Sequence, residues 1–224
     1  MGDRRIRVLD DQTEGGPRLV LREERGVIEI VAGNVVLLSS AALETERAFG
    51  RLIADAPGSL GRAPAQVLVG GLGFGATLRG VLDAAPVSAR VVVVERFAAV
   101  ERLVRGELAR IAGAPLNDPR VRVVVADVAQ VIAVPEEPFD AILLDVDNGP
   151  EWATSRDNAR LYTPAGLARA FEALAPGGTL AVWSGYPVAP FVPRLRAAGF
   201  AASTVPLFER GRVRARAYLG IKPR

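Results

Sequence analysis

The densest group of chemically useful side chains lies in the ten residues 142–151. Three carboxylates and one amide, from Asp145, Asp147, Glu151 and Asn148, follow an apolar run that has the length of a strand. Carboxylates can hold a cationic group and can take a proton from an amine. The segment Asp-Asn-Gly-Pro also favours a turn, which accounts structurally for part of the cluster. The turn does not require Asp145, however, and we therefore predict a functional role for this residue.

The chain has no cysteine and no histidine. This composition excludes disulfides, thiolate nucleophiles and Cys-ligated zinc, and it removes the usual general base near neutral pH. We expect no metal site. Acid–base chemistry would fall to carboxylates, tyrosines or the backbone.

A glycine-rich segment, Val69-Gly-Gly-Leu-Gly-Phe-Gly-Ala, joins a predicted strand to a predicted helix. Glycines at such a junction let the backbone turn tightly and approach a ligand. The segment also satisfies the dinucleotide pattern Gly71-x-Gly73-x-x-Ala76. A turn without a ligand is the structural alternative.

An acidic residue follows each of the next two predicted strands. Glu95 stands about 20 residues beyond the glycines, where an acid can accept both hydroxyls of a ribose, although a solvated glutamate would also fit there. Asp127 could accept the exocyclic amine of an adenine, and it is equally a natural N-cap for the following helix. Two acids after successive strands fit an adenosine better than a dinucleotide. The residues expected to bind the cofactor are Gly71, Gly73, Phe74, Gly75, Glu95, Arg96, Asp127 and Val128.

The elements that must position these residues alternate between strands and helices from Gln66 onward. Short apolar runs separated by helical periods indicate an α/β fold with a parallel sheet covered on both faces. The last two strand-like runs, 200–208 and 213–221, are too close for a crossover and must form an antiparallel hairpin. The other predicted strands are 66–70, 90–95, 121–126, 140–146 and 178–184, and the predicted helices lie near 75–84, 97–112, 164–175 and 188–198, with a shorter one after Asp127.

Residues 1–60 have a different sequence pattern. Strand-like runs begin at Leu19, Val27 and Val35, and glycine-containing turns separate them. A helix-like stretch follows from Ala42 to about Ala54. We therefore predict a small N-terminal β-hairpin and helix segment over 1–60 and a nucleotide-binding domain over 61–224.

Composition limits the class of protein. The 224 residues, half of them apolar, suffice for one sizeable core. The net charge is only +3, and the arginines are interleaved with acids. This pattern is more typical of a solvated surface than of a surface that binds nucleic acid. No apolar run approaches the roughly 20 residues of a membrane span, and no signal peptide is expected. We predict a cytoplasmic protein without nucleic-acid or membrane partners.

A parallel sheet that ends in one reversed strand resembles the seven-stranded, Rossmann-like fold of class I S-adenosylmethionine-dependent methyltransferases. Within it, the motifs resemble the spermidine synthase family, the polyamine aminopropyltransferases, from about Val27 to Leu219. This resemblance implies a homodimer, decarboxylated S-adenosylmethionine as co-substrate, and Asp145 as the group that helps to deprotonate the attacking amine. The amine site would include Asp147, Asn148, Glu151 and Tyr162. The motifs are the glycine-rich segment, Asn117-Asp-Pro-Arg-Val-Arg-Val, Phe139-Asp-Ala-Ile-Leu-Leu-Asp, Leu161-Tyr-Thr-Pro-Ala-Gly-Leu and Leu174-Ala-Pro-Gly-Gly-Thr-Leu.

The chain departs from that family at charged and polar positions. Phe74 stands where the family carries an aspartate for the aminopropyl ammonium, and Asn148 where it carries a second acid. The family's glutamine falls near Leu37, and its polyamine-binding tyrosine has no counterpart between residues 34 and 57. Four interpretations stay open: aminopropyl transfer to an amine, methyl transfer from S-adenosylmethionine, a non-catalytic adenosine-binding module, and a nicotinamide dehydrogenase.

Overall fold

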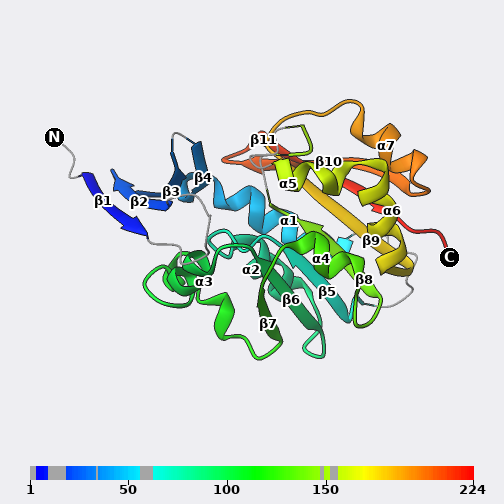
Figure 1. Cartoon of the computed structure of the whole chain (residues 1–224), viewed down its shortest axis with the longest axis horizontal. Helices are drawn as coiled ribbons and strands as arrows, with labels where there is room; N and C mark the ends of the chain where they lie inside the picture. Colours follow the sequence, from blue (N-terminus) through cyan, green and yellow to red (C-terminus); the bar gives the residue numbers. More distant parts are fainter. Residues whose placement is uncertain (1–3, 10–18, 34, 56–62, 147–148, 152–155) are drawn as a thin grey trace.

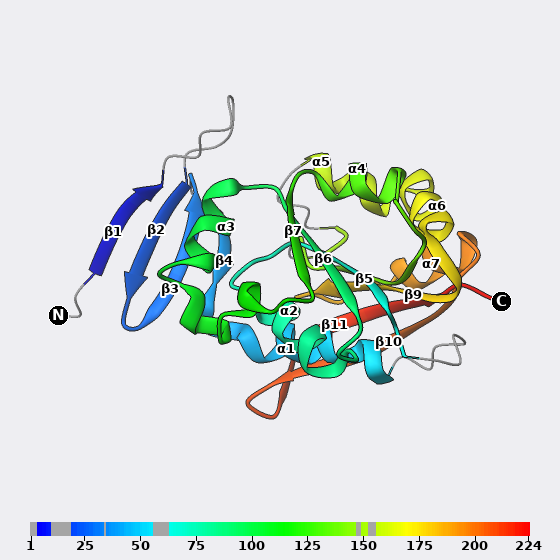
Figure 2. The same cartoon turned by 90° about the horizontal axis from the view of Figure 1, so that it is seen from below.

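The computed structural model describes residues 4–9, 19–33, 35–55, 63–146, 149–151 and 156–224. Its main body is a seven-stranded sheet with helices on both faces, and a four-stranded antiparallel sheet lies at one end of that body (Figures 1 and 2). Within those ranges, no helix combines the length and the apolar character that a membrane crossing would require.

The seven-stranded sheet has the order β10-β11-β9-β8-β5-β6-β7. The strands β5 to β9 pair in parallel, and β11 is antiparallel to both β9 and β10. The predicted Rossmann-like sheet with a reversed C-terminal hairpin is therefore confirmed. The strands are β5 (Gln66–Gly70), β6 (Arg90–Glu95), β7 (Val121–Val125), β8 (Phe139–Leu144), β9 (Leu174–Ser184), β10 (Ala201–Glu209) and β11 (Arg212–Ile221).

Each face of the sheet carries its own hydrophobic cluster. Helices α1, α2 and α3 cover one face, and α4, α6 and α7 cover the other (Figure 2). The helix predicted over 97–112 is wrong in its second half, because α3 ends at Arg105 and Gly106 leaves the helical conformation (φ −105°, ψ −112°). The helices are α1 (Leu43–Asp55), α2 (Ala76–Ala84), α3 (Ala98–Arg105), α4 (Val128–Ala133), α5 (Arg156–Ala159), α6 (Pro164–Ala173) and α7 (Phe191–Ala197), with 3₁₀ turns at Ser40–Ala42, Ala109–Ala112, Pro115–Asn117 and Arg160–Tyr162.

The four-stranded sheet has the order β1-β2-β3-β4, and all its neighbours are antiparallel. Its first strand was not among the predicted ones. Leu38 of β4 reaches the glycine-rich segment of the large sheet, since a Cβ on Gly73 would lie 3.6 Å from its Cδ2. The N-terminal sheet therefore contacts the candidate site directly. Its strands are β1 (Arg4–Leu9), β2 (Leu19–Glu24), β3 (Val27–Ala32) and β4 (Val35–Ser39).

Helices α1 and α2 cross with their backbones in contact. A Cβ on Gly50 of α1 would lie 2.1 Å from the carbonyl oxygen of Thr77, and a Cβ on Gly80 of α2 would lie 2.1 Å from that of Arg47. Any side chain larger than hydrogen would separate the helices at either position. The two glycines therefore bring residues 47–50 of α1 against residues 77–81 of α2.

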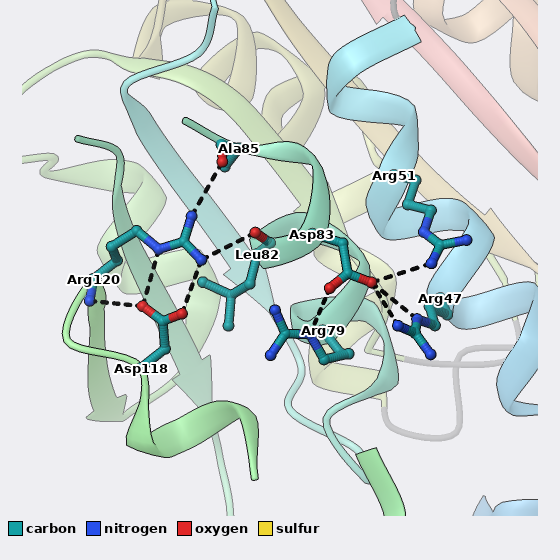
Figure 3. Close-up of polar contacts among 8 residues, drawn as sticks. All are labelled: Arg47, Arg51, Arg79, Leu82, Asp83, Ala85, Asp118 and Arg120. Atoms are coloured by element: carbon teal, nitrogen blue, oxygen red, sulfur yellow. Dashed lines mark hydrogen bonds and ion pairs between the residues drawn. The ribbon is translucent and has the colours of Figure 1, made fainter. Parts of the chain in front are cut away.

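An ion-pair cluster around Asp83 secures this crossing (Figure 3). The Asp83 carboxylate accepts hydrogen bonds from Arg47 (2.7 Å) and Arg51 (3.1 Å) of α1 and from Arg79 (2.9 Å) of its own helix. Burial acts to raise the pKa of Asp83, but the bonds from Arg47 and Arg51 hold it below its ordinary value. In the same view, Arg120 pairs with Asp118 and donates to the carbonyls that end α2.

Candidate functional site

The loop after β5 is built on three glycines with left-handed backbone, at φ +89° (Gly71), +53° (Gly73) and +88° (Gly75). A Cβ on Gly71 would lie 2.1 Å from the carbonyl oxygen of Asp145, and one on Gly75 would lie 2.7 Å from Pro115. Two of the glycines are therefore required by the protein's own close packing. Only Gly73, with a single neighbour at 3.6 Å, has room beside its backbone. The Phe74 side chain is 1% exposed and belongs to the core, not to the loop surface.

Glu95 closes β6 and is a buried anchor. Its Oε2 accepts from the backbone N–H of Leu72 (3.0 Å) and its Oε1 from that of Phe97 (2.8 Å). The side chain therefore ties the glycine loop to the loop after β6, which excludes the interpretation as a solvated residue. A carboxylate offers roughly four acceptor sites, so these bonds are compatible with further bonds from hydroxyl groups.

Asp127 caps α4, as predicted from its position. Its Oδ1 accepts from the backbone N–H of Ala129 (2.8 Å), and its Oδ2 pairs with Arg160. The neighbouring Val128 is buried in the core, whereas Arg96, which follows Glu95, is exposed. The Asp127 carboxylate is therefore shared between the start of α4 and the guanidinium of Arg160.

Asp145 follows the last residue of β8 and lies against the glycine loop and α2. Its backbone N–H donates to the carbonyl of Gly70 (2.8 Å), and its Oδ2 accepts from the hydroxyl of Thr77 (2.5 Å). Burial raises the pKa of Asp145 from 3.8 to about 6, although the bond from Thr77 acts to lower it. The group is therefore poised for proton transfer close to neutral pH.

The structure adds two acids that the sequence analysis missed, Glu46 of α1 and Glu209 at the end of β10. Burial raises the pKa of Glu46 well above its ordinary value, and the charges of Asp145 and Glu209 raise it further. The hydroxyl of Thr77 also lies 3.3 Å from the carbonyl oxygen of Glu46. Helical spacing could have identified Glu46, because it precedes the buried Phe49 by three residues. No sequence signal marks Glu209.

The remaining predicted residues lie elsewhere or are not described. Glu151 pairs with Arg194 of α7 (3.2 Å), with both side chains partly exposed. Tyr162 is buried on the face opposite α1, where its ring meets Phe191 edge-on with centroids 5.9 Å apart. Asp147 and Asn148 lie outside the described residues. Among the residues that are described, no group of acids is arranged to hold a metal ion.

Comparison with known proteins agrees with this architecture. No family model matches the chain. A polyamine aminopropyltransferase of Mycobacterium tuberculosis is 34% identical over 146 residues, and the same holds for one of Mycobacterium bovis. The match covers 61% of this chain, and it spans only 27% of the length of those relatives.

Two solved structures share the fold. Spermidine synthase from Thermotoga maritima superposes with a TM-score of 0.70 at 20% identity, over 96% of this chain and 72% of the other. A probable spermidine synthase from Corynebacterium glutamicum gives a TM-score of 0.59 at 17% identity, over 96% and 79%. The resemblance expected from the motifs is thus confirmed: the chain is similar in sequence to polyamine aminopropyltransferases, and it has the fold of the spermidine synthases.

Proposed function

We propose that this chain is an aminopropyltransferase-like enzyme that transfers a group from decarboxylated S-adenosylmethionine, or from S-adenosylmethionine, to a small amine. The observation that carries the proposal is the carboxyl group of Asp145. It lies at a strand end beside the glycine loop, and its pKa of about 6 suits a general base near neutral pH. In an open α/β sheet this end of the parallel strands is where ligands bind.

The adenosine half of the co-substrate would lie along the glycine loop. Gly73 has no side chain, and only Leu38 would lie within 4 Å of a Cβ there, so a ligand would meet the loop backbone directly. Glu95 is held by two backbone N–H groups, where it would accept from ribose hydroxyls. Asp127 and the start of α4 would hold the adenine. When bound, the sulfonium supplies the electrophilic carbon.

The amine would enter on the Asp145 side. A protonated amine is not a nucleophile, so Asp145 would first hold it as a cation and then accept its proton. The amine nitrogen would form the new N–C bond as the C–S bond breaks, and the electron pair would leave with the sulfur as a neutral thioether. With the partners aligned, positioning provides much of the acceleration.

Methyl transfer from S-adenosylmethionine is the second candidate, and Phe74 favours it. A core phenylalanine stands at the position where the family that the chain resembles has an aspartate that binds the aminopropyl ammonium. Such an acid would contribute roughly 1.5–3 kcal/mol through a charge-assisted hydrogen bond. Without it, the affinities for the two forms of the cofactor should lie within about tenfold.

Calorimetry with S-adenosylmethionine, its decarboxylated form, methylthioadenosine and S-adenosylhomocysteine tests the proposal. We expect methylthioadenosine to bind and to raise the melting temperature, because a ligand that binds only the folded state stabilises it. Each cofactor is then incubated with amines, and the product is identified by mass. Failure of all four compounds to bind at millimolar concentration would contradict the cofactor assignment. Binding without any product would favour the non-catalytic interpretation.

A further inference from the structure

A pocket of about 600 Å³ opens at the end of β9, beside the turn of the β10–β11 hairpin. The turn lies next to α1 in both views (Figures 1 and 2), and Glu44 of α1 accepts from the backbone N–H of Arg210 (3.1 Å). Ala41, in the turn that precedes α1, also lines the pocket, so the pocket lies beside the start of the helix that carries Glu46. Its polar and aromatic lining comes from Trp183, Tyr186, Glu209, Arg210, Arg212 and Arg214.

A register shift in the hairpin decides which side chains face this pocket. Leu207 pairs with Ala215, but the next partners are Phe208 with Val213 and Glu209 with Arg212, so β11 holds one extra residue. Directly opposed residues project from the same face, and strict alternation would have placed Arg212 on the face opposite Ala215. The bulge turns Arg212 to the side of Glu209 and α1.

The arginines of this pocket differ from most others in the molecule. Many other described guanidiniums pair with carboxylates, as Arg47 does with Asp83 and Arg194 with Glu151. Within the described part of the chain, the side chains of Arg210, Arg212 and Arg214 form no ion pair. All three residues are exposed, so they place up to three positive charges at the solvent-facing rim of the pocket.

The buried part of the pocket lining has a different character. The Oε2 atom of Glu209 and the Nε1 atom of Trp183 are both buried, and neither has a hydrogen-bond partner among the described residues. A ligand that satisfied both would bring one donor and one acceptor, because a carboxylate only accepts and an indole N–H only donates. Beyond Glu209, the carboxyl groups of Glu46 and Asp145 continue the acidic side toward the end of β8.

A charge gradient therefore runs from acids near Asp145 to arginines at the hairpin turn. A diamine or polyamine would place its second ammonium against the unpaired guanidiniums, where like charges repel. A carboxylate or phosphate at that end would instead accept charge-assisted hydrogen bonds from them. Resting on the transferase function above, we propose that the acceptor is an amine that carries an anionic group at its far end, and not a diamine or polyamine.

The test compares acceptors that differ in their far group. Putrescine is set against 4-aminobutanoate and 3-aminopropyl phosphate, which keep the amine and replace the second ammonium with a carboxylate or a phosphate. Affinity is measured by calorimetry with methylthioadenosine present, and product formation is measured with both cofactors. We expect at least one anionic amine to bind about tenfold or more tightly than putrescine, and the comparison of the two distinguishes carboxylate from phosphate.

Arginine variants identify the source of that preference. Arg212→Gln should weaken binding of the anionic amine about tenfold, which equals about 1.4 kcal/mol, and the double variant R212Q/R214Q should abolish the preference. Arg216→Gln is the matched control, because Arg216 lies on the same strand and does not line the pocket. Melting temperatures verify that all variants fold.

The outcomes separate the two proposals. Tight binding of an anionic amine without product upholds the class of ligand that the pocket binds and contradicts the transferase function. Product with putrescine and not with the anionic amines contradicts the acceptor class and leaves the transferase function in place. Binding of neither class, or equal losses in the Arg212 and Arg216 variants, also overturns the proposed acceptor.

Discussion

The two halves of the candidate site are built in different ways. In the cofactor half, Glu95 and Asp127 each accept from a backbone N–H two residues further along the chain. In the proposed acceptor half, Asp145 accepts from Thr77 of α2, and its charge raises the pKa of Glu46 of α1. Glu209 comes from a hairpin at the other edge of the sheet. Local hydrogen bonds make the first half rigid and recognisable from sequence. The second half depends on how distant elements pack.

The halves also differ in how their carboxylates affect the stability of the fold. In the cofactor half, hydrogen bonds from backbone N–H groups replace the hydrogen bonds to water that each carboxylate loses on burial. Asp145 and Glu46 have raised pKa values because burial disfavours their charged forms. The proposed acceptor half therefore holds acids whose charged forms reduce stability at neutral pH. The following three variants test this contrast.

Asp145→Asn has the largest expected effect. It keeps the shape of the side chain and removes the base, so turnover should fall by about 10²–10⁴. Binding of methylthioadenosine should change by no more than a few-fold. In the wild type, kcat should rise with pH through about 6, where Asp145 loses its proton, and then level off. Full activity of the variant on a working acceptor would contradict the base assignment.

The same variant should be more stable than the wild type at neutral pH. The raised pKa means that the folded protein holds a proton that the unfolded chain releases between about pH 4 and 6. The stability linked to Asp145 is therefore present below pH 4 and is lost as the pH rises through 6. Replacement by Asn should raise the free energy of unfolding at pH 7 by roughly 2–3 kcal/mol, with no gain below pH 4. Urea titrations at both pH values measure this difference.

Glu95→Gln should have an intermediate effect, confined to the cofactor half. The carboxylate uses both of its oxygens to accept from two backbone N–H groups, whereas an amide keeps only one acceptor oxygen. Methylthioadenosine should therefore bind less tightly by roughly 1–3 kcal/mol. Glu101→Gln, on the surface of α3, is the control. Calorimetry gives the affinities. An unchanged affinity would show that Glu95 acts only as a structural anchor of the loop.

Thr77→Val should have the smallest effect. The variant removes the hydroxyl that donates to Asp145 and lowers its pKa. The midpoint of the kcat–pH profile should therefore shift upward, while kcat at high pH stays close to that of the wild type. Thr204→Val, at an exposed position of β10, should leave the midpoint in place. A downward shift would mean that the hydroxyl stabilises the protonated form of Asp145.

Much of the fold follows from the sequence because its signals are local. The apolar runs before Gly71, Glu95 and Asp145 are strand-sized, and parallel strands bring their carboxyl ends to one edge of the sheet. The short connection at residues 210–211 left antiparallel pairing as the only choice for the last two strands. The end of α3 at Arg105 was missed because the helical spacing of apolar residues continues beyond Gly106.

The sequence by itself determined the sheet, the glycine loop and the acids at three strand ends, because each depends on residues that are neighbours in the chain. Only the tertiary structure decided the acceptor half. Backbone contact at Gly50 and Gly80 brings Glu46 toward Asp145, and a bulge of one residue turns Arg212 to the side of Glu209. Helix crossings and strand registers depend on packing between distant segments, and a shift of one residue exchanges the faces of a strand. That is why the charges proposed to select the acceptor could not be placed from the sequence.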